Sequence, residues 1–273
     1  MSCEDKYKTL LQQLRRLGPA AVAFSGGVDS TLLLRAAIEA LGTEKVLAIT
    51  ADSPFFPRWE QQDSQSLARQ LGARQILIQC DLLALPEVAR NDAMRCYHCK
   101  KALFGLCLKV ADEHGFSLML DGTNRDDDHD YRPGHQAALE LGVRSPLAEA
   151  GLTKNDIRNL SRQRDLPTWD RPAFACLASR IPYGTAIDRE QLAQIEQCET
   201  ALRTLGFNGV RARHHGQTVR IEITPGLFPK ILDDATRRAV IAGAKTAGFT
   251  YVSLDLEGYR TGSLNEALKP PDA

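Results

Sequence analysis

Short apolar runs alternate with longer amphipathic stretches along the first half of the chain. A short apolar run that ends in glycine or polar residues is typical of a buried strand, whereas apolar residues along one helical face are typical of a helix. The pattern predicts strands at residues 20–24, 46–50, 75–79, 117–120 and 144–147, and helices at residues 29–41, 61–71 and 99–114. Because strands that alternate with helices form parallel sheets with right-handed crossovers, we predict an α/β fold with a Rossmann-like parallel sheet.

The pattern changes after Pro182. Alternating apolar and polar residues on both sides of His215 and Gly216 predict a β-hairpin. The last third is predicted to contain, in order, a helix, two strands, a helix and a strand at residues 188–205, 210–214, 219–223, 230–247 and 250–254. We therefore expect a parallel-sheet domain at residues 1–185 and a smaller α-β-β-α-β domain at residues 186–273, which contacts the substrate and supports oligomerisation.

Polar or glycine-containing loops follow three of the predicted strands, at residues 25–30, 51–53 and 121–124. Ligands of parallel sheets bind beyond the carboxyl ends of the strands. We therefore expect the three loops to converge on one nucleotide site, with residues 51–53 beside adenosine. Besides the first loop, the residues expected at this site are Asp52, Ser53, Gly122, Thr123 and Asn124.

The first loop, Ser25-Gly26-Gly27-Val28-Asp29-Ser30, lies between a predicted strand and a predicted helix. Its glycines let backbone N–H groups close on a phosphate, and the N-terminus of the following helix adds unpaired donors and partial positive charge. Asp29 would repel phosphate, so we expect it to cap the helix or to hold Mg²⁺. An ordinary serine-capped helix is the competing interpretation, which the full string in this setting disfavours. We therefore predict that the loop binds ATP by its phosphates.

This loop differs from the P-loop of many NTPases, which needs a Lys followed by Ser or Thr, because no Gly-Lys pair occurs in the chain. Its string is instead the signature of the PP-loop ATP pyrophosphatases. That resemblance implies cleavage of ATP between the α- and β-phosphates. A substrate carboxylate or carbonyl would become an adenylate, and pyrophosphate would be released.

Residues 95–101, 121–134 and 171–184, together with the phosphate loop, resemble the LarE-type ATP-dependent sulfur transferases of that superfamily. The resemblance runs from about Ala20 to Gly262, nearly the whole chain. It implies an enzyme that adenylates a substrate similar to pyridinium-3,5-biscarboxylate mononucleotide and then replaces AMP with sulfur to give a thiocarboxylate. The product belongs to the biosynthesis of the nickel-pincer nucleotide cofactor of lactate racemase and related enzymes, and other proteins of that biosynthesis are candidate partners.

Cys176 stands at the position of the family's reactive cysteine. In one kind of family member this cysteine gives up its own sulfur and becomes dehydroalanine, whereas in the other kind three cysteines hold a [4Fe-4S] cluster that carries an extra sulfide. Cys96 and Cys99 form a Cys-x-x-Cys pair, which puts two thiolates within reach of one metal centre. We favour the cluster, held by Cys96, Cys99 and Cys176, and keep a cluster-free Cys176 donor as the alternative. A Cys-x-x-Cys pair by itself is also typical of a zinc site or a redox pair.

Arg211 and Arg213 lie on one face of a predicted strand, because strand side chains alternate between two faces. Two neighbouring guanidiniums suit a phosphate, and the family resemblance implies that they face the substrate nucleotide. A solvated basic strand is the alternative. We expect Arg180 to hold a phosphate near the reacting carbon, and Glu222 on the partner strand to bind a divalent ion or to balance the arginines.

The charges of the chain balance, with 34 Lys and Arg residues against 34 Asp and Glu residues. A neutral chain has no global field that attracts a polyanion, which counts against a tRNA thiolation enzyme of the same superfamily. An ammonia-dependent amidating ligase is the other alternative, and in it the cysteines would be incidental. No apolar run reaches the roughly 18 residues that span a bilayer, and we expect a cytoplasmic protein without membrane or nucleic-acid partners. The family resemblance also implies that the protein forms a homo-oligomer.

Overall fold

The central strand β1 (Ala20–Ala23) can be buried on both faces because its residues are small and apolar. The computed structural model describes residues 1–129, 133–172, 175–260 and 263. It places β1 in a four-stranded sheet of order β3-β2-β1-β4, in which every pairing is parallel. The partners of β1 are β2 (Val46–Asp52) and β4 (Met119–Leu120), and β3 (Arg74–Gln79) pairs with β2. The predicted α/β fold with a parallel sheet is confirmed.

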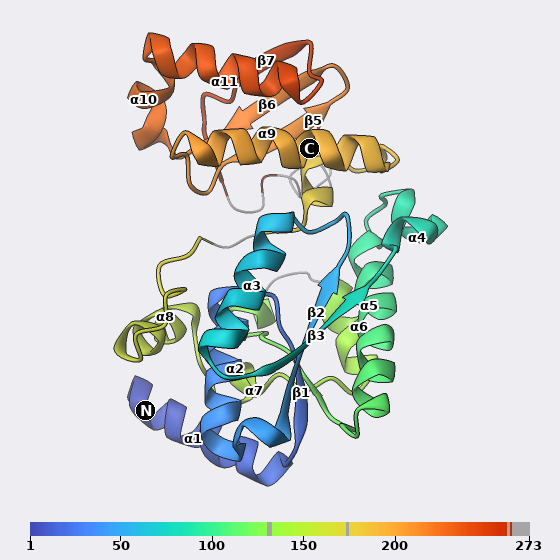
Figure 1. The fold of residues 1–273 in the computed structure, drawn as a ribbon, viewed down its shortest axis with the longest axis vertical. Coiled ribbons are helices and arrows are strands. Elements are labelled where there is room, and N and C mark those ends of the chain that lie inside the picture. Colours follow the sequence, from blue (N-terminus) through green and yellow to red (C-terminus); the bar gives the residue numbers. More distant parts are fainter. Residues whose placement is uncertain (130–132, 173–174, 261–262, 264–273) are drawn as a thin grey trace, which may run out of the picture. The chain divides into compact units, whose positions relative to one another are not determined.

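Helices cover both faces of this sheet (Figure 1). Ala20 and Val22 pack in one core with α1 (Cys3–Leu17), α2 (Val28–Leu41), α3 (Arg58–Gln70) and α8 (Lys154–Gln163). Ala21 lies in a second core with α5 (Arg95–Glu113) and α6 (Pro133–Glu140). Successive side chains of a strand point to opposite faces, so a strand covered on both sides must be apolar throughout, as β1 is.

The chain divides into two compact units. Unit 1 contains Met1–Cys80 and Cys96–Ala173, and unit 2 contains Asp81–Arg95 and Phe174–Ala273. The first segment of unit 2 includes the short helix α4 (Pro86–Ala89) and the buried Asn91, whose amide donates to the carbonyls of Pro182 and Thr185 at 2.8 and 2.9 Å. The boundary predicted at residue 185 lies within unit 2. In the part of the chain that the structure describes, no helix is long and apolar enough to cross a membrane.

Unit 2 contains a small mixed sheet of order β5-β6-β7. The strands β5 (Arg211–His215) and β6 (Thr218–Glu222) form the predicted antiparallel hairpin, and β7 (Tyr251–Leu254) pairs parallel to β6. The helices that pack on this sheet around the buried Phe207 are α9 (Arg189–Thr204), α10 (Phe228–Leu232) and α11 (Asp234–Thr246).

The strand predicted at residues 144–147 is wrong. Arg144 forms one isolated parallel bridge with Leu120, and a short helix, α7 (Pro146–Glu149), begins two residues later. Proline has no N–H to donate to a strand ladder, and its fixed φ suits the first turn of a helix. Pro146 therefore ends the extended segment that the apolar pattern predicts.

Two helix predictions also need correction. The single helix predicted at residues 230–247 is two helices, because Asp233 leaves the helical conformation and caps α11 by accepting a hydrogen bond from Thr236 N at 3.0 Å. Helix α5 begins at Arg95 rather than at residue 99. This earlier start places both Cys96 and Cys99 on the helix.

Truncating a core leucine of unit 2 tests this packing. Leu202 on α9 is 1% exposed, so Leu202→Ala should lower the free energy of unfolding of this unit by about 2–5 kcal/mol, because the truncation leaves a cavity. Leu232 on α10 is 62% exposed, and Leu232→Ala should change it by less than about 0.5 kcal/mol. Hydrogen exchange of the β6 amides measures both effects, and equal effects would contradict the packing described.

Candidate active site

The loop between β1 and α2 requires glycine at its first turn. Gly26 has φ +74°, a conformation that costs little for glycine alone. A Cβ at Gly26 would also lie 3.1 Å from both Cα and Cβ of Ser64 on α3. Gly27 is the N-cap of α2 and has an extended conformation, with φ −74° and ψ 169°. The glycines therefore let the chain turn sharply against α3 and enter α2 at once.

Hydroxyl groups hold this loop in shape. Ser25 Oγ lies 3.1 Å from Ser30 Oγ and accepts from Gly27 N at 3.3 Å, and Ser30 Oγ donates to Gly27 O at 3.3 Å. The N-terminus of α2 has no side-chain cap among the described contacts. The first N–H groups of a helix lack intrahelical partners and carry partial positive charge, so this end of α2 suits an anion.

The loop after β4 lies directly against the first loop, as predicted. A Cβ at Gly122 would lie 3.1 Å from Ser30 N and 3.3 Å from Asp29 Cβ, so a side chain there would displace the phosphate loop. Asn124 Nδ2 donates to Asp29 Oδ1 at 3.4 Å. Thr123 donates from both its backbone N–H and its hydroxyl to the buried Asp121, which also accepts from Ser145 Oγ at 2.7 Å.

The residues predicted after β2 lie at the carboxyl end of a neighbouring strand. Thr50 Oγ1 donates to Phe24 O at 2.6 Å, which ties the end of β2 to the start of the phosphate loop. Asp52 accepts a hydrogen bond from Gln79, and the buried Ser53 accepts one from Phe55 N at 3.5 Å. These contacts are local, and the placement of Asp52 and Ser53 beside adenosine stays a prediction.

Two cations reach the phosphate loop from distant parts of the sequence, and the sequence pattern does not single them out. Lys154, the first residue of α8, forms an ion pair with Asp29. Arg171 Nη1 donates to Gly26 O at 3.3 Å, and its Nη2 lies 3.0 Å from Asp63 Oδ2. Burial raises the pKa of the Asp29 carboxyl, and Lys154 beside it opposes that shift. The loop thus contacts positive charge at both ends.

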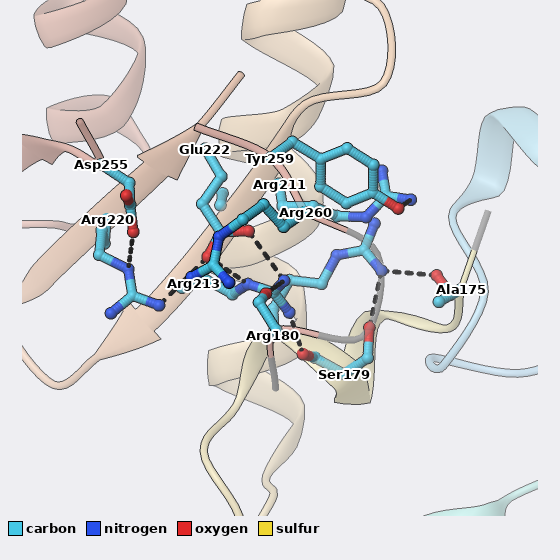
Figure 2. Close-up of polar contacts among 12 residues, drawn as sticks. Ala175, Ser179, Arg180, Arg211, Arg213, Arg220, Glu222, Asp255, Tyr259 and Arg260 are labelled. Atoms are coloured by element: carbon cyan, nitrogen blue, oxygen red, sulfur yellow. Dashed lines mark hydrogen bonds and ion pairs between the residues drawn. The ribbon is translucent and has the colours of Figure 1, made fainter. Parts of the chain in front are cut away.

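In unit 2, Arg180 contacts residues on both sides of Cys176, and Figure 2 shows its contacts with Ala175 and Ser179. Arg180 is 1% exposed and forms a two-pronged ion pair with Glu199 on α9, at 2.8 and 2.9 Å. Its Nη1 donates to Ala175 O at 2.6 Å and to Cys176 O at 3.1 Å. Glu199 also accepts from Ala212 N at 2.9 Å, so one carboxylate joins the cysteine segment, residues 175–180, to β5. These contacts favour a positioning role for Arg180.

Arg211 and Arg213 share one face of β5, and each contacts a different partner (Figure 2). Arg213 forms a two-pronged ion pair with Glu222 at 2.9 and 2.8 Å and donates to Ser179 O at 2.6 Å. Arg211 lies over the ring of Tyr259, with 4.7 Å from the guanidinium carbon to the ring centroid. Burial and the charge of Arg180 lower the pKa of Arg211.

Glu222 is surrounded by positive charge. Besides Arg213, Arg220 lies 3.1 Å from its Oε1, and Glu222 is 1% exposed. A carboxylate that already accepts from two guanidiniums is a poor ligand for a divalent cation, because both of its oxygens are engaged. Of the two roles predicted for Glu222, its contacts favour the balance of arginine charge.

Cys96 and Cys99 lie one turn apart on α5 in unit 1, and Cys176 precedes the short 3₁₀ helix Leu177–Arg180 in unit 2. All three are partly exposed. No three Cys, His, Asp or Glu side chains lie close enough to hold one metal ion within the described residues. Asp130, Tyr131 and Arg132 of the string 121–134 lie outside those residues, as do residues 173–174 and 261–262.

The cysteines should differ sharply in reactivity. Cys107 and Cys198 are buried, and burial raises the pKa of each to about 12, which suppresses the reactive thiolate. In native protein treated with a chelator, iodoacetamide at pH 8 should label Cys96, Cys99 and Cys176 at least about tenfold faster than Cys107 and Cys198. Peptide mass spectrometry measures the rates, and urea should make them alike. Fast native labelling of Cys107 would contradict the burial described.

Some known proteins resemble only a part of this chain, and others resemble nearly all of it. The NAD synthase family matches residues 5–94. A glutamine-dependent NAD(+) synthetase of Synechocystis sp. is 45% identical over 53 residues, which is 19% of this chain and 10% of that protein. The match to the NAD synthase family thus covers the part of the chain that contains the phosphate loop.

Two other relatives match nearly from end to end. An uncharacterized protein of Synechocystis sp. is 42% identical over 265 residues, which is 97% of this chain and 98% of that protein. The pyridinium-3,5-bisthiocarboxylic acid mononucleotide synthase of Lactiplantibacillus plantarum is 37% identical over 265 residues, which is 96% of this chain and 95% of that protein. The similarity to this synthase includes unit 2 and the cysteine segment.

Proposed function

The chain belongs to the LarE-like family of PP-loop ATP pyrophosphatases, and on that premise we propose that it inserts sulfur into a carboxylated pyridinium mononucleotide at the expense of ATP. The product is a thiocarboxylate for the nickel-pincer nucleotide cofactor of lactate racemase-like enzymes. The proposal rests on a phosphate loop whose hydroxyls hold it in shape at the uncapped N-terminus of α2. The chain that contains this loop matches a thiocarboxylate-forming synthase over 96% of its length.

In the first step a carboxylate oxygen of the substrate attacks the α-phosphorus of ATP. The bond between the α-phosphorus and its bridging oxygen breaks, pyrophosphate leaves, and the carboxylate becomes an acyl adenylate. The uncapped N-terminus of α2 and the hydroxyls of Ser25 and Ser30 bind the phosphates. Asp29 has carboxylate oxygens of the kind that Mg²⁺ prefers, but one accepts from Asn124 and the other from Lys154, so Mg²⁺ would bind there only by displacing one of these donors.

In the second step a sulfur nucleophile attacks the carbonyl carbon of the adenylate. The carbon–oxygen bond to AMP breaks, AMP leaves, and a thiocarboxylate remains. Arg211, which stacks on Tyr259 in unit 2, is the residue that we assign to the phosphate of the pyridinium nucleotide. Arg213 and Arg180 are each paired with a glutamate, and their remaining donors hold the carbonyls of Ser179, Ala175 and Cys176.

We assign the sulfur-donor role to Cys176 together with Cys96 and Cys99. The spacing of Cys96 and Cys99 on α5, one turn apart and partly exposed, fits two ligands of one cluster. A bound [4Fe-4S] cluster with three protein ligands would present its fourth iron for a sulfide. The alternative is that the Cys176 thiolate attacks the adenylate and forms a thioester as AMP leaves. Loss of the Cα proton of Cys176 to a base then breaks its Cβ–S bond, which leaves the thiocarboxylate and a dehydroalanine at position 176.

Replacement of Cys176 should separate the two steps. Cys176→Ala should abolish the thiocarboxylate product and still release pyrophosphate from ATP when the pyridinium substrate is present, because the adenylation residues lie in the phosphate loop. Mass spectrometry of the nucleotide and a coupled pyrophosphate assay measure the two steps. Thiocarboxylate formation by Cys176→Ala at the wild-type rate would disprove the role of this cysteine.

Counting products per chain distinguishes the two sulfur sources. After anaerobic reconstitution with iron and sulfide, the wild type should make several thiocarboxylates per chain when sulfide is supplied. Cys96→Ala and Cys99→Ala should make at most one, and Cys107→Ala, a buried cysteine off the site, should behave as the wild type. A wild-type stop at one product, with Cys176 converted to dehydroalanine, would overturn the cluster and support the sacrificial thiol.

A further inference from the structure

A buried asparagine of unit 2 holds an uncommon backbone conformation just after α4. Asn91 has φ +57°, in the left-handed region that residues other than glycine seldom adopt. It is fully buried, and its side-chain amide donates to Pro182 O and Thr185 O at 2.8 and 2.9 Å, with Ile181 O 3.4 Å away. Its backbone carbonyl accepts from Gly184 N at 3.0 Å. A left-handed residue that so many contacts hold in place is a candidate for a functional role.

Arg95 extends this set of contacts to the cysteine segment. Arg95 Nη1 donates to Asn91 Oδ1 at 2.5 Å and to Ala178 O at 3.1 Å. Arg95 is 3% exposed, and its guanidinium carbon lies 5.2 Å from the ring centroid of Tyr183. Burial of a guanidinium costs free energy, which is offset only where its donors meet acceptors in a fixed geometry. The position of Ala178 is therefore tied to that of a buried cation within unit 2.

We propose that Arg95, oriented by Asn91, is a positioning residue for sulfur transfer, and the inference rests on the sulfur-donor role proposed above for Cys176. Attack on the adenylate needs the reacting atoms about 3–3.5 Å apart, and a displacement of about 1 Å can slow such a step by about a hundredfold. Arg95 does not take part in the chemistry. It holds the backbone that carries Cys176 in the conformation from which sulfur is delivered.

The contact of Arg95 adds to those of the two arginine–glutamate pairs described above. The arginines of those pairs hold the carbonyls of Ala175, Cys176 and Ser179. Arg95 holds the carbonyl of Ala178, which lies between them in the sequence. A charged donor forms a stronger hydrogen bond to a carbonyl than a neutral donor does. Loss of Arg95 should therefore loosen the cysteine segment locally, while both arginine–glutamate pairs remain.

A purely structural role for Asn91 and Arg95 is the alternative, and two variants of the same unit serve as controls. Arg189→Met removes an exposed ion pair with Asp81 at 2.6 Å, which ties the same stretch of chain to α9. Leu202→Ala opens a cavity in the core of unit 2 and shows what general destabilisation does. A structural contact should behave as Leu202→Ala does, whereas a positioning contact should affect one step of the reaction.

The first test measures both steps with the full chain and pyridinium-3,5-biscarboxylate mononucleotide, after the anaerobic reconstitution described above. Arg95→Met should slow thiocarboxylate formation by about tenfold or more and leave the initial release of pyrophosphate within about twofold of the wild type. Asn91→Ala, which removes the acceptor that orients Arg95, should show the same split. Arg95→Lys should stay within about threefold of the wild type, because an ammonium can replace the single nitrogen that makes both contacts. Arg189→Met should carry out both steps as the wild type does.

Hydrogen exchange gives a second readout that needs no substrate. The amides of Ser179 and Ile181 donate to Cys176 O and Ala178 O at 3.0 and 3.2 Å. In Arg95→Met these two amides should exchange about tenfold faster, whereas the β6 amides should exchange as in the wild type. Leu202→Ala should instead speed exchange of the β6 amides.

The outcomes separate the inference from the function on which it rests. If Arg95→Met forms the thiocarboxylate as fast as Arg189→Met, the inference is overturned. It is also overturned if Arg95→Met slows both steps and speeds exchange of the β6 amides, because the contact is then structural. If the wild type releases no pyrophosphate with the substrate, or Cys176→Ala still transfers sulfur at the wild-type rate, the proposed function itself has failed.

Discussion

The close approach of the Gly26 backbone to Ser64 is the constraint on which the nucleotide site depends. The chain that leaves β1 turns at Gly26 with φ +74°, and a Cβ there would crowd Ser64 on α3 at 3.1 Å. The turn brings Gly27 to the N-cap of α2 without a side-chain cap. The same turn presents Asp29 and Ser30 to the loop after β4, where Gly122 is close-packed against them. Small residues at these positions thus allow the close approach of the two loops and leave the N-terminus of α2 without a side-chain cap, an arrangement that suits an anion.

Unit 2 is organised around two buried arginine–glutamate pairs. Burying such pairs contributes little net stability, because the cost of desolvation offsets the attraction, but losing one partner leaves a costly unpaired charge. Arg180 with Glu199, and Arg213 with Glu222, direct their remaining donors to the carbonyls of Ala175, Cys176 and Ser179. The pairs therefore fix the backbone around Cys176, the cysteine that we propose as sulfur donor, and this positional role accounts for their burial.

Much of the fold follows from the sequence pattern, and the exceptions have physical causes. The parallel sheet follows from apolar runs between amphipathic helices. The phosphate loop follows from residues 25–30, whose glycines permit a sharp turn into a helix. The prediction omits α1, although Tyr7, Leu10, Leu11 and Leu14 are buried on one face after a Ser2–Asp5 capping box. Contacts such as Lys154 with Asp29, or Arg171 with Gly26 O, cannot be predicted from the spacing of apolar and polar residues, because only tertiary folding brings such distant residues together. The partner of a given arginine is equally nonlocal: Arg180 faces Glu199, whereas the pattern suggested a phosphate.

In the proposed reaction, ATP activates a carboxylate of the pyridinium nucleotide as an adenylate. The most direct test uses a substrate with oxygen-18 in its carboxyl groups and follows the label by mass spectrometry. Transfer of sulfur to the adenylate leaves the attacking carboxylate oxygen on the phosphorus, so each AMP released with thiocarboxylate should carry one oxygen-18 atom. AMP without the label, or ADP and phosphate in place of AMP and pyrophosphate, would contradict the account.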